Sequence, residues 1–309
     1  MEYYKNWDEV IANVSEFPHP ERLVIACADD ARALEAAQKA AAHATVAPIL
    51  VGDRAKIEPL AEAAGMDLTQ VPVHHEPDND KAAALAVSLI REGKADYLMK
   101  GHIESSALLK AVVSKDHGLT RGRLISHISY IEVPSYHKMI AITDGGMVVY
   151  PTLDQKKTIM DHAVNMLLTM GYNKPKVAVL AGIEKVNPKM KETVDAAALK
   201  EMNRNGDIRG CVVEGPIAVD IALSKEKARQ KDFVSEVAGE ADILLVPDLC
   251  CGNCIAKILL EMAGGRMAGV VVGASVPIVL TSRSSSMEEK YLSIVISAAF
   301  SARKIKNLE

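Results

Sequence analysis

The sequence lacks the signature motifs of several common enzyme classes. No G-x-G-x-x-G, G-x-x-x-x-G-K-[ST], G-x-S-x-G or H-E-x-x-H pattern occurs in its 309 residues. These patterns mark, in turn, the dinucleotide-binding turn, the P-loop, the nucleophile elbow of serine hydrolases and a zinc-binding helix. Their absence argues against an active site of any of these four kinds.

The chain also lacks an excess of positive charge, a secretory leader and a membrane-spanning run. Its formal net charge is -4, which argues against a general nucleic-acid-binding surface but not against a local basic pocket. The first ten residues show no basic stretch followed by an apolar one. The longest weakly polar run, residues 269–281, is too short to span a bilayer and contains Pro277. We therefore expect a cytoplasmic protein with neither a membrane nor a nucleic-acid partner.

Cysteine is scarce, and its number is odd. Five cysteines suit a reducing compartment better than a disulfide framework. Cys250, Cys251 and Cys254 lie close together, and the last two have the C-x-x-C spacing of a zinc or redox site. No second C-x-x-C and no H-x-x-x-H completes a tetrahedral site. We therefore expect no metal here and interpret the cysteines as small, buried side chains.

Short β-rich runs alternate with Ala-rich helical segments, which predicts βαβ units and a mainly parallel sheet. Strands are predicted at residues 22–29, 46–52, 95–101, 127–133, 138–143, 175–182, 210–216, 241–247 and 269–281, the last as one strand or a pair. Helices are predicted at 30–44, 57–64, 81–92, 105–113, 155–170, 191–203, 218–224, 252–262 and 288–304.

Residues 126–150 break this alternation, because two strands in succession predict an antiparallel excursion that ends in the turn sequence TDGG. The prediction is a two-lobed α/β protein. The first lobe comprises residues 1–145, to which the helix 286–309 returns, and the second comprises residues 146–285.

Polar or glycine-containing loops follow several of the predicted strands. In parallel α/β sheets ligands bind outside the carboxyl ends of the strands, so these loops are candidates for one shared cleft. For any single loop, ordinary turn chemistry is an equally sufficient reason for its glycine or proline. The loops begin with Lys100-Gly101, Asp144-Gly145, Ala181-Gly182, Glu214-Gly215 and Pro247-Asp248.

The end of the last predicted strand carries the strongest functional pattern. Residues 270–280 are apolar enough to be buried on both faces. Ser282 and Arg283 follow at once, and a guanidinium there suits bidentate binding of a phosphate. Ser284–Ser286 add hydroxyls at the start of a helix, where free N–H groups attract anions. Ser286 and Glu289 also fit a plain capping box, S-x-x-E.

Several segments resemble the phosphate acetyl/butyryltransferases, and the phosphotransbutyrylase branch in particular. They are VPDLCCGNCIAK and GVVVGASVPIVLTSRSSSMEEK, preceded by ADYLMKGHIESSALLKAVV, VNPKMKETVDAAALKEM and GCVVEGPIAVDIAL. The resemblance covers residues 95–300 in order. It implies exchange of an acyl group between coenzyme A and inorganic phosphate, with no cofactor. It also implies two α/β lobes, as in isocitrate and isopropylmalate dehydrogenases, and a homodimer or higher homo-oligomer.

The resemblance further implies roles for residues. Arg283 would hold phosphate, Ser282 would donate a hydrogen bond to the substrate carbonyl, and Glu289 or Glu288 would accept the proton of the coenzyme A thiol. The expected binding residues for coenzyme A and phosphate are Lys100, Gly101, Lys110, Asn187, Gly215, Pro216, Asp220, Gly252 and Asn253.

Three departures from the family pattern stand at these positions. Cys250-Cys251 replaces an acid-containing pair, Lys110 replaces an arginine, and Ser284-Ser285 replaces Ala-Asp. Arginine and lysine are not equivalent at a bidentate phosphate site, so the role of Lys110 is open. These departures keep one alternative of another class, a coenzyme A- or acyl phosphate-binding protein that has lost activity.

Three further alternatives concern chemistry. Acetyl-CoA could replace butyryl-CoA as the substrate, because sequence does not set chain length. A metal- and NAD-dependent decarboxylating dehydrogenase of the same fold would need clustered carboxylates, for which Asp144, Asp154 and Asp220 are available without close spacing. A route through an acyl-cysteine would need a histidine such as His102 or His127 beside the cysteines.

Overall fold

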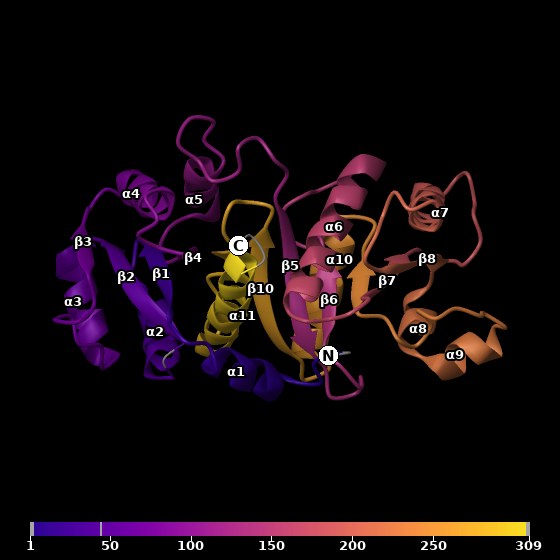
Figure 1. The fold of residues 1–309 in the computed structure, drawn as a ribbon, viewed down its shortest axis with the longest axis horizontal. Coiled ribbons are helices and arrows are strands. Elements are labelled where there is room, and N and C mark those ends of the chain that lie inside the picture. Colours follow the sequence, from indigo (N-terminus) through magenta and orange to yellow (C-terminus); the bar gives the residue numbers. More distant parts are fainter. Residues whose placement is uncertain (1–2, 44, 307–309) are drawn as a thin grey trace. The chain divides into compact units, whose positions relative to one another are not determined.

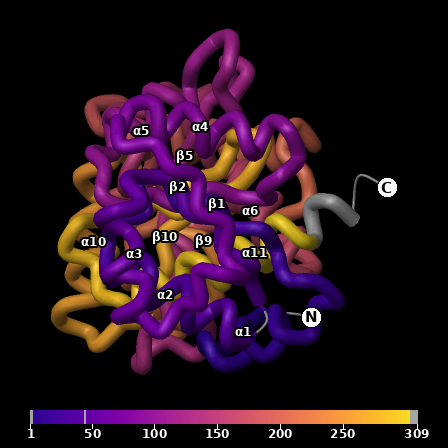
Figure 2. The backbone as a smooth tube through the Cα atoms, turned by 90° about the vertical axis from the view of Figure 1, so that its left-hand side faces the viewer, coloured from indigo at the N-terminus to yellow at the C-terminus, as the bar shows by residue number. Residues whose placement is uncertain are grey.

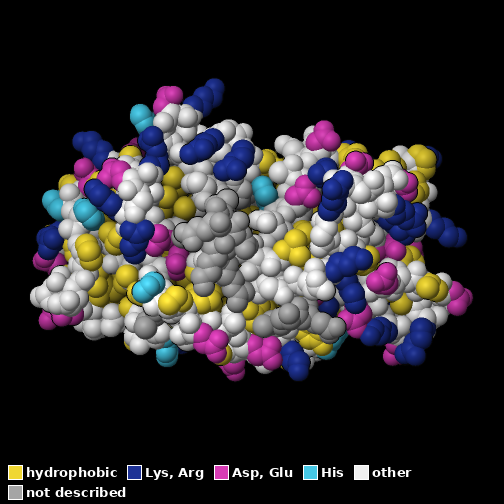
Figure 3. Space-filling view, in the orientation of Figure 1, with side chains coloured by type: hydrophobic (Ala, Val, Ile, Leu, Met, Phe, Trp, Pro, Cys, Tyr) yellow, Lys and Arg dark blue, Asp and Glu magenta, His cyan; other side chains and the backbone are white. Residues whose placement is uncertain are grey.

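The computed structural model describes residues 3–43 and 45–306, which form an α/β structure (Figure 1). These residues divide into two compact units. Unit 1 combines the described residues up to Asn6 with Ser126–Met267, and unit 2 combines Trp7–Ile125 with the chain from Ala268 onward. Basic and acidic side chains are both present on the face shown in Figure 3. No helix in the described ranges is long and apolar enough to cross a membrane.

The strands of unit 2 are parallel except at one side of the sheet. Their order is β3-β2-β1-β4-β11-β10, and only β10 and β11 run antiparallel to each other. The chain moves from β1 outward to β3 and then returns to β4 on the other side of β1. The strands are β1 (Glu21–Ala26), β2 (Val46–Gly52), β3 (Val73–His75), β4 (Tyr97–Lys100), β10 (Arg266–Val272, in this unit from Ala268) and β11 (Ile278–Val279).

Aspartates begin three of the helices of unit 2. The side chains of Asp30, Asp53 and Asp78 accept hydrogen bonds from backbone N–H groups of the first turns of α2, α3 and α4. Helix α11 packs against α2, and α4 lies beside α5 (Figures 1 and 2). The helices are α1 (Trp7–Ser15), α2 (Ala31–Ala42), α3 (Arg54–Ala63), α4 (Asn79–Arg91), α5 (Ser105–Val112) and α11 (Met287–Lys306).

Alanines and apolar strand residues form the core of unit 2. Ala33, Ala36, Ala37 and Ala40 of α2 are completely buried, and such small side chains let helices approach each other closely. Every residue from Tyr291 to Phe300 in α11 is buried as well. A helix without a polar face must be surrounded, so α11 is a core element and not a surface tail.

Unit 1 has its own sheet and its own core. The strand order is β5-β6-β9-β7-β8, with only β5 and β6 antiparallel. The strands are β5 (Ser126–Glu132), β6 (Ile140–Thr143), β7 (Lys176–Leu180), β8 (Val212–Ile217) and β9 (Ile243–Leu245). The helices are α6 (Leu153–Thr169), α7 (Lys191–Arg204), α8 (Val219–Leu223), α9 (Lys225–Gln230) and α10 (Leu249–Glu261). Ile142, Leu244 and Ala256 lie in one buried cluster of this unit.

The bounds of the two units differ from those of the predicted lobes. The first lobe was predicted at residues 1–145 with the helix 286–309, and the second at residues 146–285. Strand β6 pairs with both β5 and β9, which keeps the antiparallel excursion in unit 1. Strand β11 pairs with β4, which keeps the chain from Ala268 onward in unit 2. Ser282 and Arg283 therefore belong to the same unit as Lys100, whereas the predicted lobes separated them.

The predicted elements are present with small shifts at their ends, and the predicted antiparallel excursion is confirmed. The run 269–281 contributes to two strands, β10 and β11, because Gly273 has a φ of +96° and reverses the chain there. Three short elements have no counterpart in the prediction, namely α1, β3 and α9.

Candidate anion site and comparison with known proteins

In unit 2 the carboxyl ends of β1, β4 and β11 meet at one edge of the sheet. Their parallel pairing sets Ala26 beside Lys100 and Val279 beside Met99. Strand order reverses between β1 and β4, which is where open α/β sheets bind their ligands. A cavity of about 210 Å³ lies at this edge. It is lined by Asp30, Lys100, Gly101, His102, Ile103 and Arg283.

Backbone contacts hold the loop after β4 tightly against the end of β1. Gly101 N–H donates to the carbonyl oxygen of Ala26 at 2.9 Å, and His102 N–H donates to that of Cys27 at 2.7 Å. A Cβ on Gly101 would lie 2.1 Å from the Cys27 carbonyl oxygen. Only glycine fits here, so the role of Gly101 is to bring the neighbouring side chains to the cavity.

Lys100 is a buried cation at the wall of the cavity, only 4% exposed. Its Nζ donates to the carbonyl oxygen of Ile103 at 3.0 Å and to that of Gly101 at 3.5 Å. Burial, together with the positive charges of Lys290 and Arg283, lowers the pKa of Lys100. An anion in the cavity would favour the charged form of this lysine.

Lys290 is a second buried lysine, 2% exposed, on the first part of α11. Its Nζ donates to Asp30 Oδ2 at 3.3 Å and to Thr281 Oγ1 at 3.2 Å. Asp30 also accepts from the N–H of Ala33 at 3.0 Å as the cap of α2. Lys290 therefore ties α11, the end of β11 and the start of α2 together beside the cavity.

Ser282 and Arg283 lie at the surface of this site. Ser282 Oγ is 3.0 Å from Ser284 Oγ. Arg283 forms an ion pair with Glu104, in which the two side chains are 67% and 66% exposed. Exposed pairs of this kind contribute about 0–1 kcal/mol, so a phosphate could displace Glu104 from the guanidinium.

Glu289 caps helix α11. Its Oε2 accepts from the N–H of Ser286 at 2.7 Å, its own N–H donates to Ser286 Oγ at 3.1 Å, and its Oε1 accepts from Ser285 Oγ at 3.4 Å. The capping-box interpretation is thus confirmed. Glu288 is exposed in the first turn of the same helix. Neither glutamate lines the cavity.

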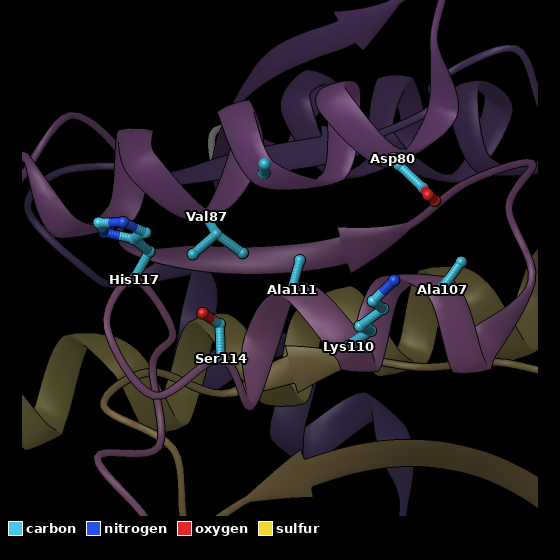
Figure 4. A pocket seen from close by; sticks show the side chains of 8 residues that line it. Asp80, Val87, Ala107, Lys110, Ala111, Ser114 and His117 are labelled. Carbon is cyan, nitrogen blue, oxygen red and sulfur yellow. The ribbon is translucent and has the colours of Figure 1, made fainter.

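Lys110 lines a different cavity, of about 260 Å³, between α4 and α5. Lys110 and Asp80 project toward the space between these two helices, and Val87 forms part of its wall (Figure 4). His117 lies at the other end of the row of side chains shown in Figure 4 and is 3.2 Å from Arg91. The structure therefore does not bring Lys110 into the cavity of Lys100 and Arg283.

The predicted binding residues of unit 1 serve its local structure. Asn187 Oδ1 accepts from the N–H of Lys189 at 3.0 Å, and its backbone bonds to Thr193 Oγ1, which shapes the loop before α7. Asp220 forms an ion pair with Lys231 at 3.2 Å, and although burial opposes it, this hydrogen-bonded pair lowers the pKa of Asp220.

The predicted glycines of unit 1 are required by close packing. A Cβ on Gly215, just before Pro216, would lie 2.8 Å from Val179 Cβ. A Cβ on Gly252 would lie 2.9 Å from the Asp144 carbonyl oxygen. The next residue, Asn253, donates from Nδ2 to the carbonyl oxygen of Gly145 at 3.2 Å, so helix α10 is fixed against the turn after β6.

That turn also decides the role of Asp144. The 2%-exposed carboxylate accepts hydrogen bonds from four backbone N–H groups, at 2.7–3.3 Å. The donors are residues 127, 146, 147 and 148. Asp144, Asp154 and Asp220 are not a metal-binding cluster, and within the described part of the chain no three His, Cys, Asp or Glu side chains are arranged to hold a metal ion.

Similarity to known proteins identifies the family of this chain. A family model described as phosphate acetyl/butaryl transferase matches residues 72–298. The chain is 39% identical over 300 residues to the phosphate butyryltransferase of Clostridium acetobutylicum. The aligned region covers 97% of this chain and 99% of that protein. The chain belongs to the phosphate acetyl/butyryltransferase family. It is also 38% identical over 280 residues to the phosphate acetyltransferase of Thermotoga maritima, covering 91% of this chain and 95% of that one.

Solved structures agree with this family membership. A branched-chain phosphotransacylase from Enterococcus faecalis superposes with a TM-score of 0.82 at 30% identity, over 91% of this chain and 99% of that chain. A putative 4-hydroxythreonine-4-phosphate dehydrogenase from Salmonella typhimurium gives 0.57 at 14% identity, over 91% and 99%, and shows the fold alone. The predicted α/β class and its likeness to a dehydrogenase fold are confirmed.

Several residues at the family's Ser-Arg strand end were not predicted as part of the site. Asp29, Asp30, Glu104 and Lys290 were not predicted, and His102 was predicted only as part of a candidate cleft loop and as the partner that an acyl-cysteine route would need. The available signal was position, because all but Lys290 follow the carboxyl end of β1 or β4, beside the predicted Lys100-Gly101. The only sequence signal for Lys290 was its position at the start of an otherwise apolar helical run.

The three neighbouring cysteines of α10, two of which depart from the family pattern, have different environments. Cys250 and Cys254 are exposed on α10. Cys251 packs partly buried against the core of unit 1, and its N–H donates to Asp248 Oδ1 at 2.9 Å. Burial raises the pKa of the Cys251 thiol, which disfavours the nucleophilic thiolate.

Proposed function

We propose that this family member exchanges a butyryl group between coenzyme A and inorganic phosphate. The observation that carries the proposal is the cavity at the strand ends of unit 2, where Arg283 and the buried Lys100 line one space next to Ser282. The 39% identity to a phosphate butyryltransferase supports the acyl group. The family also includes acetyltransferases, so acetyl-CoA is the alternative substrate.

The proposed chemistry is a direct transfer in a ternary complex. An oxygen of inorganic phosphate attacks the thioester carbonyl carbon, the carbon–sulfur bond breaks, and the thiolate of coenzyme A leaves. The guanidinium of Arg283 can hold two phosphate oxygens with its planar fork, and Lys100 adds a point charge from the cavity wall. No group is oxidised or reduced in this reaction, so we propose that no redox cofactor and no metal are required.

Ser282 is proposed to stabilise the transition state. Its exposed hydroxyl can donate a hydrogen bond to the carbonyl oxygen as negative charge develops there. One well-placed donor of this kind contributes about 10²–10³ in rate. Asn187, Gly215, Pro216, Asp220, Gly252 and Asn253 of unit 1 stay predicted contacts for coenzyme A or phosphate, together with Lys110.

We further propose acyl-CoA and phosphate as the only partners besides other copies of the chain, in a homodimer or higher homo-oligomer. A cytoplasmic location is supported by the odd number of cysteines, none of which forms a disulfide among the described residues. Molar mass from light scattering would test the oligomer.

The direct test is release of coenzyme A from acetyl-, propionyl-, butyryl- and isobutyryl-CoA, followed at the free thiol with and without phosphate. We expect phosphate-dependent release that is fastest with butyryl-CoA. Arg283→Ala should lower kcat/KM for phosphate by about 10²–10³. The matched control is Arg54→Ala, because Arg54 forms a similarly exposed pair with Glu58 in the same unit.

Two outcomes would contradict the proposal. Wild-type protein that binds coenzyme A without releasing it from any thioester would instead support a binding protein that has lost activity. Arg283→Ala that turns over at the wild-type rate would remove Arg283 from the mechanism.

A further inference from the structure

A histidine and an aspartate are paired at the mouth of the anion cavity. His102 lines the cavity together with Lys100 and Arg283. Its Nδ1 lies 3.3 Å from Asp29 Oδ2. The aspartate side chain is 15% exposed and the imidazole is 68% exposed. A mostly buried carboxylate thus holds one ring nitrogen, while the rest of the ring is accessible to a molecule entering the cavity.

The backbone positions both residues. Asp29 follows β1 directly, and the His102 N–H donates to the Cys27 carbonyl oxygen at 2.7 Å. Gly101 leaves no room for a side chain against Cys27, so the loop that carries His102 packs directly on the end of β1. The loop cannot move away from β1 without losing this packing and the hydrogen bond to Cys27. The ring is therefore presented from a rigid support, as acid–base catalysis requires.

The other candidates for proton transfer are less well placed. Both carboxylate oxygens of Glu289 accept hydrogen bonds from the cap of α11. Glu288 lies outside the set of residues that line the cavity. Asp30, the remaining acid in the cavity wall, is engaged with Lys290 and with the N-terminus of α2.

We propose that His102, oriented by Asp29, exchanges the proton of the coenzyme A thiol; the inference rests on the proposed acyl transfer. An Nδ1–H that donates to Asp29 leaves Nε2 as the acceptor. In the direction of acyl-CoA synthesis, Nε2 takes the S–H proton and the thiolate attacks the carbonyl carbon of the acyl phosphate. The carbon–oxygen bond to phosphate then breaks, phosphate leaves with the electron pair of that bond, and it takes up the proton from the imidazolium as hydrogen phosphate.

The reverse direction returns the proton. Hydrogen phosphate gives its proton to Nε2 as its oxygen attacks, and the imidazolium passes that proton to the sulfur of the leaving thiolate, so the protons balance. Asp29 holds the other ring nitrogen throughout, and the cations Lys100 and Arg283, which line the same cavity, favour the thiolate. The other acidic groups here are Glu104, which is paired with Arg283, and Asp30, which is paired with Lys290.

The test compares His102→Gln, Asp29→Asn and Glu288→Gln in the reaction of butyryl phosphate with coenzyme A, as kcat/KM against pH. His102→Gln should lower kcat/KM by about 10²–10⁴ and remove the limb in which activity rises with pH. Asp29→Asn should cause a smaller loss. His19→Gln is the control, since His19 is exposed in the same unit and does not line the cavity.

Rescue separates chemistry from structure. Added imidazole should restore part of the activity of His102→Ala and none to Arg283→Ala, because a free base replaces only a missing base. The KM for phosphate should change little in His102→Gln. If wild-type protein shows no transfer, the proposed function fails. If wild-type protein is active and His102→Gln keeps its rate and pH limb, or Glu288→Gln alone loses the limb, the inference about His102 is wrong.

Discussion

Buried lysines occur in both units, but their partners differ. In unit 1, Lys156 and Asp195 are 2.9 Å apart with side chains 5% and 7% exposed, and Lys138 and Asp242 are 2.6 Å apart with 2% and 5%. In unit 2, Lys100 is equally buried but donates to carbonyl oxygens at the wall of a cavity. A buried cation therefore indicates a ligand only where no carboxylate already neutralises it.

Lys290 stands between these two cases. It has a carboxylate partner, Asp30, as the lysines of unit 1 do, but that carboxylate also lines the cavity. We interpret Lys290 as a residue that holds the wall of the cavity together and adds positive charge behind it. The comparison thus separates structural ion pairs in unit 1 from charges placed for an anion in unit 2.

The largest predicted effect is on the stability of unit 1. Asp195→Ala leaves Lys156 buried without its carboxylate and should lower the free energy of unfolding by about 3–5 kcal/mol. Urea unfolding followed by circular dichroism measures it. The partly exposed pair of Lys157 with Asp161 is the control, and Asp161→Ala should cost under about 1 kcal/mol.

The double variant Lys156→Met, Asp195→Leu sharpens this prediction. Apolar replacement of a buried ion pair is often neutral or stabilising, so the double variant should recover most of the lost stability. A loss as large as that of Asp195→Ala would mean that the pair does more in unit 1 than neutralise charge.

The second effect concerns pH. Burial alone would raise the pKa of Glu240, but hydrogen bonds from Lys225 and His137 and the charge of Lys138 outweigh it and lower the pKa to about 2, from an ordinary 4.5. Because the folded-state pKa is the lower one, the stabilisation is complete above about pH 4.5 and is lost as pH falls toward 2. The partners Lys225 and His137 are 65% and 44% exposed, so solvent screening reduces this stabilisation to roughly 1–2 kcal/mol at pH 7.

Unfolding of wild type and Glu240→Gln between pH 7 and pH 3 measures this stabilisation. The difference between them should be largest at neutral pH and should shrink steadily below pH 4.5. A difference that does not change with pH would show that Glu240 acts through packing or hydrogen bonds rather than through its charge.

A smaller effect is expected at the start of α11. Ser286→Ala removes the acceptor for the N–H of Glu289 and should cost about 1 kcal/mol of stability. The exposed Ser106, inside α5, is the matched site, and Ser106→Ala should be neutral or slightly stabilising. Equal effects at both sites in thermal unfolding would argue against the capping box.

The smallest effect concerns Glu104, which competes with phosphate for the guanidinium of Arg283. Glu104→Gln removes the carboxylate that pairs with Arg283 and should lower the KM for phosphate by at most about fivefold, the equivalent of an exposed pair of up to ~1 kcal/mol. The difference should shrink at high salt. Glu58→Gln, which frees Arg54 instead, should leave that KM unchanged, and a rise in KM with Glu104→Gln would mean that Glu104 helps to bind substrate.

Much of the fold could be predicted from local pattern. The strand before Asp30 and the helix that follows it were predicted with a helix start within one residue of α2, whereas α3 begins at Arg54, three residues before the predicted start at residue 57. Strand β3 and helix α9 were missed because each is short and weakly apolar. The lobe bounds at residues 145 and 285 depended on strand pairing, which sequence order does not contain.

The family membership and the Ser282-Arg283 strand end were determined by the sequence itself, since both are contiguous patterns of residue types. Tertiary structure alone decided which distant residues join them. Parallel pairing of β1, β4 and β11 brings Asp29, Lys100 and His102 to the edge that carries Arg283, and it places Lys110 in another cavity. It also assigns Glu289 to the helix cap. The physical reason is that a site at strand ends is built from segments whose proximity is set by backbone hydrogen bonds between strands, not by their order in the chain.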